Sequence, residues 1–519
     1  MKKTILFSTA LTAVMASSLL ATPMAMAYTP DTSNIDIQGV QAEVQANAYK
    51  FVDVNWDATK DQPANPQYTW AAGVADWVKT NFPDYIGDGN RVTAQFESSL
   101  SDDGSLKNHQ PADNGAATFY DKLSKAIKAG EVTLTPAKTV TADGETASIP
   151  DMGIGGYLVL FTGGTNVYRP SVAVVKPTYD EANHTWKLAD KTDLTVKKSA
   201  IPVTKTIDDK AVGVTDTATF SVTSAVPVYP ANAVNKTFLL ADKMPSSLTL
   251  QDGTTVVGVA SDGSETALTA GVDYTVVTQD KDGKAVDLGL DFNYDRVKQY
   301  DSIKATYTAK VNDAATAGQA IPNQVHTTYA SDPYTAGGYN KTPDATVTAW
   351  TYGVDLTKVD GTTQAGLPGA TFSVQNNAGA TLKFEETSEG HYKLTDKATG
   401  VTELGTDAQG KLKVDGLDTG TYKLVEVKAP AGGYVKLENP ISFSITDANN
   451  DGVADENAST DKGYVSMTVQ NTKGFQLPVT GAAGITGMAV AGVLLLSVGG
   501  VLVAQRKRAQ KENLAQSAE

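Results

Sequence analysis

A long apolar run occupies residues 482–504, near the C-terminal end of the sequence. Its length of about 23 residues exceeds the roughly 18 that indicate a membrane-spanning helix. Arg506, Lys507 and Arg508 follow the run, and a basic flank is typical of the cytoplasmic side of a span. The pattern therefore predicts a transmembrane segment at 482–504 and a basic cytoplasmic tail at 505–519.

A second apolar stretch, Ile5 to Leu20, begins just after Lys2 and Lys3. It is followed by Ala25-Met26-Ala27, which has the small-residue pattern of a signal-peptidase site. We predict that residues 1–27 are a cleaved signal peptide and that the mature chain begins near Tyr28. The chain is therefore predicted to be secreted.

Helical periodicity appears only in the first part of the mature chain. Apolar residues form two stripes at helical spacing: Trp70, Val74, Trp77 and Val78 in the first, and Phe119, Leu123 and Ile127 in the second. Strand-like apolar runs follow at 156–161 and 171–175. We predict an N-terminal unit at 28–177, an α+β elaboration of a β-sandwich in which both stripes face the core.

The remainder of the mature chain has the pattern of a mainly β protein. Residues 190–349 alternate strand-like runs with Asp-Gly turns, and residues 350–474 continue with short strands. Thr, Val, Gly, Asp and Tyr are abundant, which favours immunoglobulin-like β-sandwich modules. We predict a middle β-sandwich at 190–349 and a second one at 350–474, in tandem.

Composition excludes several kinds of function. The net charge of −15 argues against nucleic-acid binding, because no sizeable basic surface is available to meet phosphates. The four histidines are scattered, so we expect no metal site and no cofactor. The chain has no cysteine, so an exported protein of this sequence needs a covalent staple other than a disulfide.

The segment Leu477-Pro478-Val479-Thr480-Gly481 directly precedes the apolar run and the basic tail. The order of pentapeptide, span and basic tail resembles the LPxTG cell-wall sorting signal of Gram-positive surface proteins, the substrate of sortase transpeptidases. The resemblance implies that a sortase cleaves between Thr480 and Gly481. It also implies that the Thr480 carbonyl is then joined to an amine, finally that of peptidoglycan.

The third unit resembles a collagen-adhesin B-type (Cna-B) domain. The residues that carry the resemblance are Val354 to Asp360, Leu367 to Val374, and the segment GTYKLVEVKAPAGGY at 420–434. The first two units match sortase-assembled backbone pilins more loosely. Together with the sorting signal, these matches make the whole chain resemble a major pilin.

The resemblance implies spontaneous Lys–Asn isopeptide bonds in place of disulfides. The reaction needs a neutral, buried lysine amine, an asparagine side chain beside it, and a buried carboxylic acid that polarises the amide and moves protons. In the third unit, Lys358, Asn471 and Glu426 occupy these family positions. We predict that Lys358 is joined to Asn471 with Glu426 as the catalytic acid.

The middle unit offers a similar set. Lys205 lies in a strand that resembles the family's first strand, and Asn323 lies in one that resembles the last. Asp242 occupies the position of the acid in the aspartate-using variant of these domains. We predict a Lys205–Asn323 bond with Asp242 as its acid, and we find no convincing triad in the first unit.

A pilus shaft also needs an acceptor lysine for the sorting signal of the next subunit. In pilins this lysine lies in a V-x-V-Y-P-K type motif near the end of the first domain. Lys176 fits by position, although the sequence around it, Val172 to Pro177, lacks the Tyr-Pro. A rival segment, Val226 to Pro230, has Tyr-Pro but Ala231 after it, and the next lysine there is Lys236. We predict Lys176 as the acceptor and keep Lys236 open.

These inferences predict a structural shaft subunit of a covalent pilus on the Gram-positive cell surface, anchored to the cell wall and supporting adhesion. It would be a sortase substrate rather than an enzyme, apart from autocatalytic cross-linking. Expected partners are pilin-specific and housekeeping sortases, identical subunits, minor pilins, peptidoglycan, and a host glycan or matrix ligand. The alternative is a monomeric wall-anchored adhesin that binds a host or matrix ligand.

One further motif suggests a calcium loop. Residues 447–455 match part of an EF-hand loop, but the twelfth position is Ala458 rather than Glu and no flanking helices are indicated. We favour a polar hairpin loop there.

Overall fold

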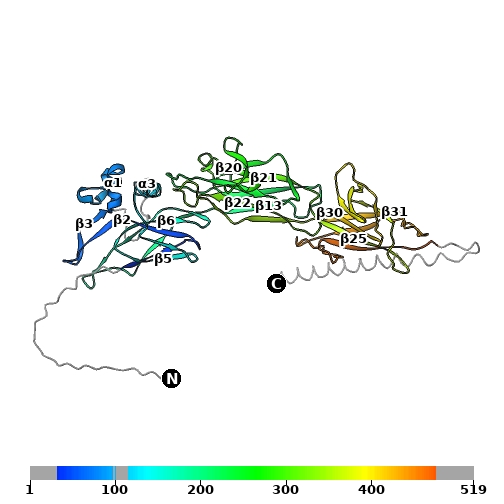
Figure 1. Ribbon diagram of the computed structural model, residues 1–519, viewed down its shortest axis with the longest axis horizontal. Coiled ribbons are helices and arrows are strands. Elements are labelled where there is room, and N and C mark those ends of the chain that lie inside the picture. The colour runs from blue at the N-terminus through cyan, green and yellow to red at the C-terminus, as the bar shows by residue number, and fades with distance from the viewer. Residues whose placement is uncertain (1–31, 98–99, 101–114, 475–519) are drawn as a thin grey trace, which may run out of the picture.

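The computed structural model describes residues 32–97, 100 and 115–474. It shows an elongated molecule in which three groups of strands follow one another along the long axis (Figure 1). Within these residues, no helix combines the length and the apolar character needed to cross a membrane. The predicted signal peptide at 1–27, the transmembrane segment at 482–504 and the tail at 505–519 lie outside the described residues.

Domain one combines strands and helices. Its elements are β1 (Ser33–Gln38), β2 (Gln45–Asp57), β3 (Gln62–Trp70), α1 (Ala72–Asn81), the 3-10 turns η1 (Pro83–Tyr85) and η2 (Asp88–Asn90), α2 (Ala94–Glu97), α3 (Gly115–Ala129), β4 (Lys138–Thr141), β5 (Thr146–Met152), β6 (Gly155–Thr162), β7 (Asn166–Tyr168), β8 (Ser171–Val175), β9 (Thr178–Asp180), β10 (Thr185–Lys187), β11 (Lys191–Thr195) and β12 (Lys198–Ala200). The main sheet has the order β3-β2-β6-β8, with β4 added along β2.

Both faces of this main sheet are covered, which explains the continuous apolar runs in its strands. Tyr157 and Val159 of β6 pack in one core with β1 and β11 of a three-stranded sheet. The alternate residues, Leu158 and Leu160, pack in a second core with Phe119 and its neighbours on the helices. A strand buried on both faces loses the alternation of apolar and polar residues. Both predicted helical stripes face this second core. Trp70 also faces it, but it is the last residue of β3 rather than part of a helix.

The first domain extends further along the chain than the sequence predicted. Strand β11 pairs in parallel with β1, and β12 pairs with β7. Residues up to Ala200 therefore belong with domain one in the structure, whereas the predicted middle unit began at residue 190. The short polar strands of this segment carry little apolar periodicity, so only the pairing reveals where they belong.

Domain two is a β-sandwich. Its elements are β13 (Val203–Ile207), β14 (Thr217–Ala225), β15 (Phe238–Lys243), β16 (Leu248–Leu250), β17 (Thr255–Val259), β18 (Glu265–Ala267), β19 (Tyr274–Gln279), β20 (Ala285–Phe292), α4 (Tyr294–Val297), β21 (Ser302–Val311), β22 (Ile321–Tyr329), β23 (Asn340–Lys341) and β24 (Ala345–Ala349). One sheet has the order β13-β14-β21-β17-β18 with β16 on β21, and the other has the order β19-β20-β15-β22-β23 with β24 on β22.

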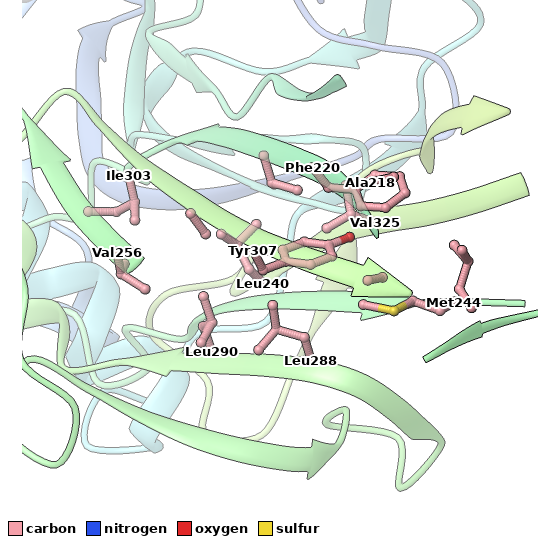
Figure 2. Close-up of a cluster of buried hydrophobic side chains, with 14 of the residues drawn as sticks. Ala218, Phe220, Leu240, Met244, Val256, Leu288, Leu290, Ile303, Tyr307 and Val325 are labelled. Carbon is pink, nitrogen blue, oxygen red and sulfur yellow. The ribbon is translucent and has the colours of Figure 1, made fainter. Parts of the chain in front are cut away.

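The core of domain two lies between these sheets. Strands β14 and β21 alternate strictly between buried and partly exposed residues, as expected of strands with one face in a core. Figure 2 shows side chains of this cluster between the strands, with Tyr307 of β21 reaching into it near Leu240 and Val325. The strand that carries Asn323 was predicted to be the last of the unit, but β23 and β24 follow it and pair with it.

Domain three is a second β-sandwich. Its strands are β25 (Tyr352–Asp360), β26 (Thr371–Gln375), β27 (Phe384–Ser388), β28 (His391–Leu394), β29 (Leu404–Gly405), β30 (Lys411–Leu417), β31 (Gly420–Lys428), β32 (Ile441–Ile445) and β33 (Tyr464–Asn471). The two sheets have the orders β27-β28-β30-β25-β33 and β29-β26-β31-β32. The first and last strands are parallel neighbours, and Lys358 lies opposite Val469. This topology places the end of the first strand, with Lys358, beside the end of the last strand, with Asn471.

Candidate cross-linking and linkage sites

The predicted triad of domain two meets in the middle of its core. Lys205 is the middle residue of β13 and faces the interior, and its side chain is fully buried. Its Nζ lies 2.5 Å from Asp242 Oδ2 on β15 and 2.7 Å from Asn323 Oδ1 on β22. The structure thus brings together residues from both sheets of the sandwich, with Asp242 37 positions and Asn323 118 positions after Lys205 in the sequence.

Burial sets the protonation of this group. Desolvation lowers the pKa of Lys205 to about 8, against the opposing pull of Asp242. Desolvation also raises the pKa of Asp242, although Lys205 and Tyr307 act in the other direction. A low dielectric disfavours both charges, so proton transfer from the ammonium to the carboxylate yields a neutral amine and a neutral acid. These are the forms that nucleophilic attack on an amide needs.

Tyr307 is a member of this group that the sequence analysis missed. Its hydroxyl donates to Asp242 Oδ2 over 2.9 Å and accepts from Asn323 Nδ2 over 2.8 Å. The ring also lies beside the lysine, with Lys205 Nζ 5.5 Å from its centroid. Burial raises the pKa of Tyr307 far above the ordinary tyrosine value, so the hydroxyl stays protonated. The alternating pattern of β21 could have marked Tyr307 as buried, but it could not have shown that its hydroxyl reaches the triad.

The predicted triad of domain three also meets in its core. Lys358 on β25 and Glu426 on β31 have fully buried side chains, and Lys358 Nζ lies 3.7 Å from Glu426 Oε1. Asn471, at the end of β33, donates from Nδ2 to Glu426 Oε2 over 3.0 Å and to the Val435 carbonyl over 2.6 Å. Desolvation lowers the pKa of Lys358 to about 8, with Glu426 opposing the shift.

The two triads differ in how their acid is held. Glu426 Oε2 also accepts from the backbone N–H of Leu437 over 2.7 Å. Asn471 Oδ1 and Glu426 Oε1 are buried without a hydrogen-bond partner among the described residues, and Asp242 Oδ1 of domain two shares this property. A buried polar atom without a hydrogen-bond partner costs folding free energy. A hydrogen bond between the Glu426 carboxyl group and Asn471 Oδ1 would therefore stabilise domain three.

Lys176 follows the last residue of β8 and is partly buried. Its Nζ donates to the hydroxyl of Tyr68 on β3 over 3.4 Å. Val172 and Val174 of β8 pack in the core that contains the helices, and Lys176 continues this alternation at the rim. The lysine therefore sits on the domain that is farthest from domain three in Figure 1.

The rival Lys236 lies in a different setting. Its Nζ pairs with Asp295 over 3.3 Å and lies over the ring of Tyr294. The neighbouring Tyr229 is buried, donates to the Thr237 carbonyl over 2.6 Å and accepts from the Ala330 N–H over 2.8 Å. The Tyr-Pro of this segment is accordingly used in packing within domain two.

Two sequence predictions remain, the sorting motif and the possible calcium loop. The sorting residues Leu477, Pro478, Thr480 and Gly481 lie outside the described residues. In the loop at 447–455, Asp447 Oδ2 accepts from Tyr352 Oη over 2.6 Å and from the Gly452 N–H over 2.8 Å. Across the described part of the chain, no cluster of three or more His, Asp or Glu side chains has the geometry for a metal ion.

Comparison with protein families gives two matches. Residues 353–459 match the family described as a prealbumin-like fold domain, SpaA. Residues 469–512 match the family described as the LPXTG cell wall anchor motif. The first match covers domain three up to the residues before β33 and includes Lys358 and Glu426, and the second includes Asn471 and the sorting residues.

Two curated proteins are similar in sequence. The trypsin-resistant surface T6 protein of Streptococcus pyogenes serotype M6 is 26% identical over 333 residues, which are 56% of this chain and 56% of that protein. The fimbrial subunit type 1 of Actinomyces viscosus is 26% identical over 445 residues, 76% of this chain and 81% of that protein. The chain thus spans little more than half the length of the T6 protein.

A solved structure supports the fold. The T6 backbone pilin of Streptococcus pyogenes serotype M6, described as a modular three-domain structure, superposes with a TM-score of 0.56. The superposition covers 86% of this chain and all of that one, at 18% identity. At this identity the likeness establishes the mainly β, tandem-domain fold.

Proposed function

We propose that this chain, which belongs with the sortase-assembled major pilins of Gram-positive bacteria, is the shaft subunit of a covalent, cell-wall-anchored surface pilus. The observation that carries the proposal is the similarity to a fimbrial subunit over 76% of the chain, combined with the match to the cell wall anchor motif. The protein acts as a sortase substrate. Its partners are sortases, identical subunits, minor pilins and peptidoglycan.

The polymerising step is a transpeptidation. A sortase cysteine attacks the Thr480 carbonyl and releases Gly481 with the tail as the leaving amine. The Lys176 amine of another subunit then attacks the thioester, forms an amide and releases the cysteine thiol. Repetition joins subunits head to tail, the heterologous arrangement that gives open fibres.

The internal step is an intramolecular amide exchange. The Lys205 amine attacks the side-chain carbonyl carbon of Asn323, and the Asn323 amide nitrogen leaves as ammonia. Asp242 receives the proton that the lysine loses, and Tyr307 connects Asp242 to the departing nitrogen. Lys358, Glu426 and Asn471 perform the same exchange in domain three. Preorganised contact replaces the entropy cost of a bimolecular encounter.

The acceptor assignment is tested by Lys176→Ala in the producing cell. Immunoblots of cell-wall extracts should show a high-molecular-weight ladder for the wild type and only monomer for Lys176→Ala, because no amine remains to resolve the thioester. Lys236→Ala is the matched control and should keep the ladder. A wild type that forms no ladder would instead indicate a monomeric anchored adhesin, and a ladder lost only in Lys236→Ala would move the acceptor to that residue.

Tyr307→Phe tests the role of the hydroxyl in domain two. Removing a preorganised hydrogen-bonding group from an amide-attack site typically slows reaction by about 100-fold. Newly synthesised Tyr307→Phe protein should therefore show a mixture of masses with and without the ammonia loss of domain two. Tyr274→Phe changes another buried tyrosine of the same core and should leave the loss complete. A complete loss in Tyr307→Phe would reduce Tyr307 to a packing role.

A further inference from the structure

Two hairpins of domain one form an aromatic and acidic surface beside Lys176. The hairpin of β9 and β10 begins two residues after Lys176 and spans residues 178–187. Its Trp186 packs edge-on against Trp56 of β2, with ring centroids 5.5 Å apart, and Tyr179 lies 5.2 Å from Trp186. We call residues 53–62 and 178–187 together the hairpin surface.

Contacts place this surface next to the proposed acceptor. Tyr68, which holds Lys176 Nζ, pairs across the sheet with Val54, two residues before Trp56. Tyr179 is 41% exposed although it is a large aromatic, so the stack presents apolar area to solvent. The two segments carry five carboxylates and two lysines. The hairpin surface therefore combines an apolar centre with an acidic rim, the arrangement of a protein interface.

The opposite end of the molecule carries a complementary surface. The end of β33 is bonded to residues 433–435: the Gly474 N–H donates to Gly433, and the Val435 N–H donates to Thr472. Val435 is 53% exposed. Residues 427–438 and 472–474, which we call the C-terminal face, contain three lysines and one glutamate. This face thus pairs exposed valine with a basic rim.

The length of the chain beyond Gly474 sets how near the two surfaces must come. Six residues lead from Gly474 to Thr480, and six extended residues reach at most about 21 Å. When Thr480 of one subunit is joined to Lys176 of another, Gly474 on the C-terminal face must therefore lie within about 21 Å of the Lys176 Nζ. Tyr179 is three residues from Lys176 in the chain and Trp186 pairs with Tyr179 across the hairpin, so the aromatic part of the hairpin surface lies inside that radius. In Figure 1 the strands of domain one and the end of domain three stand at opposite ends of the long axis, as head-to-tail stacking requires.

We propose that the hairpin surface docks the C-terminal face of a second copy of this chain, and so presents Lys176 to the sorting signal that arrives with it. The proposal rests on the function proposed above, with Lys176 as acceptor. The aromatic stack meets the exposed valines, and the acidic rim meets the lysines. Docking raises the effective concentration of the acceptor amine at the sortase-bound subunit.

The test uses two forms of the mature chain that cannot polymerise alone. The donor form is Lys176→Ala, and the acceptor form is Thr480→Ala. A pilin sortase should join them into a single covalent dimer, whose initial rate is measured against acceptor concentration. Release of the donor tail with hydroxylamine as nucleophile measures the sortase step without an acceptor subunit.

Charge exchange identifies the docking partner. Glu181→Lys on the acceptor, or Lys436→Glu on the donor, should raise the half-saturating acceptor concentration about fivefold, because each turns an exposed attraction into a repulsion. Combining both variants should restore it, and the hydroxylamine reaction should not change. Asp252→Lys on domain two of the acceptor, with the same change of charge, is the control and should leave the rate curve unchanged.

Each other outcome overturns a defined part of the proposal. Unchanged rates in both single variants would show that these surfaces do not meet. If the half-saturating concentration of the Glu181→Lys acceptor stays raised with the Lys436→Glu donor, the hairpin surface binds the sortase rather than the C-terminal face. Self-polymerisation of the Lys176→Ala donor would refute the acceptor assignment itself, and with it the docking surface, so the two failures are distinguishable.

Discussion

Lys358→Ala is expected to remove one ammonia loss from the mature chain and to destabilise domain three by about 4–5 kcal/mol. The Lys358–Asn471 bond would close a loop of about 110 residues, and covalent closure of such a loop restricts the unfolded chain by that amount in the chain-entropy model. For a domain of this size the change corresponds to a fall in melting temperature of about 15–20 °C. The wild type should weigh about 34 Da less than its sequence mass and the variant about 17 Da less, at one ammonia per bond.

Intact mass and calorimetry check this prediction on the same sample. Glu426→Gln should lose the same single ammonia deficit, because the glutamine cannot take the proton from Lys358. Lys423→Ala, an exposed residue on the same strand as Glu426, should keep both deficits and the wild-type transition. A wild type with no deficit would refute both cross-links, and a deficit of two ammonias in Lys358→Ala would assign the domain-three bond to another lysine.

Three triad residues that could be found from the sequence share one property. Each is a charged residue at a strand position where the alternation calls for an apolar one. Lys205 and Lys358 occupy inward positions of alternating strands, and Glu426 does so in β31. A charged residue at such a position is unusual unless it is paired, which makes it informative. The alternation alone could not fix its direction in β31, so the family resemblance carried that step, and the structure places all three side chains in the cores.

The parts that sequence reasoning missed depend on contacts between distant segments. Tyr307 has the pattern of an ordinary core tyrosine, and only the packing of β21 against β15 and β22 brings its hydroxyl between Asp242 and Asn323. The Val435 carbonyl that binds Asn471 comes from a loop with no pattern of its own. Strands β11 and β12 are short and polar, and their partners lie more than a hundred and about thirty residues away, respectively. Local periodicity contains no information on such pairings.

The position of the proposed acceptor explains why domain one differs from the other two. If tension enters at Lys176 and leaves at Thr480, residues before 176 lie outside the stretched path. The path would then run through residues 177–205, cross domain two by the proposed Lys205–Asn323 bond, and cross domain three by the proposed Lys358–Asn471 bond. Among the described residues of domain one no lysine is buried, so no cross-link of this type is available there. Only residues 177–200 of domain one would lie on the path, and the described part of that domain has no cross-link of this type to protect the rest of its fold.

Lys205→Ala is accordingly expected to make the shaft extensible. In the wild type, pulling between residue 176 and the sorting motif should release only the uncrosslinked segments 177–204 and 324–357, about 10 nm and about 12 nm long when extended. The variant should release about 40 nm more, because about 117 residues between positions 205 and 323 then join the path. Single-molecule force spectroscopy measures both lengths, and Lys210→Ala, a lysine in the turn after β13, should extend like the wild type. An unchanged contour length in Lys205→Ala would show that tension does not cross domain two through this bond. A wild type that already releases the additional 40 nm would show that the bond does not form, because a closed amide between β13 and β22 leaves the intervening strands no route to unfold under tension.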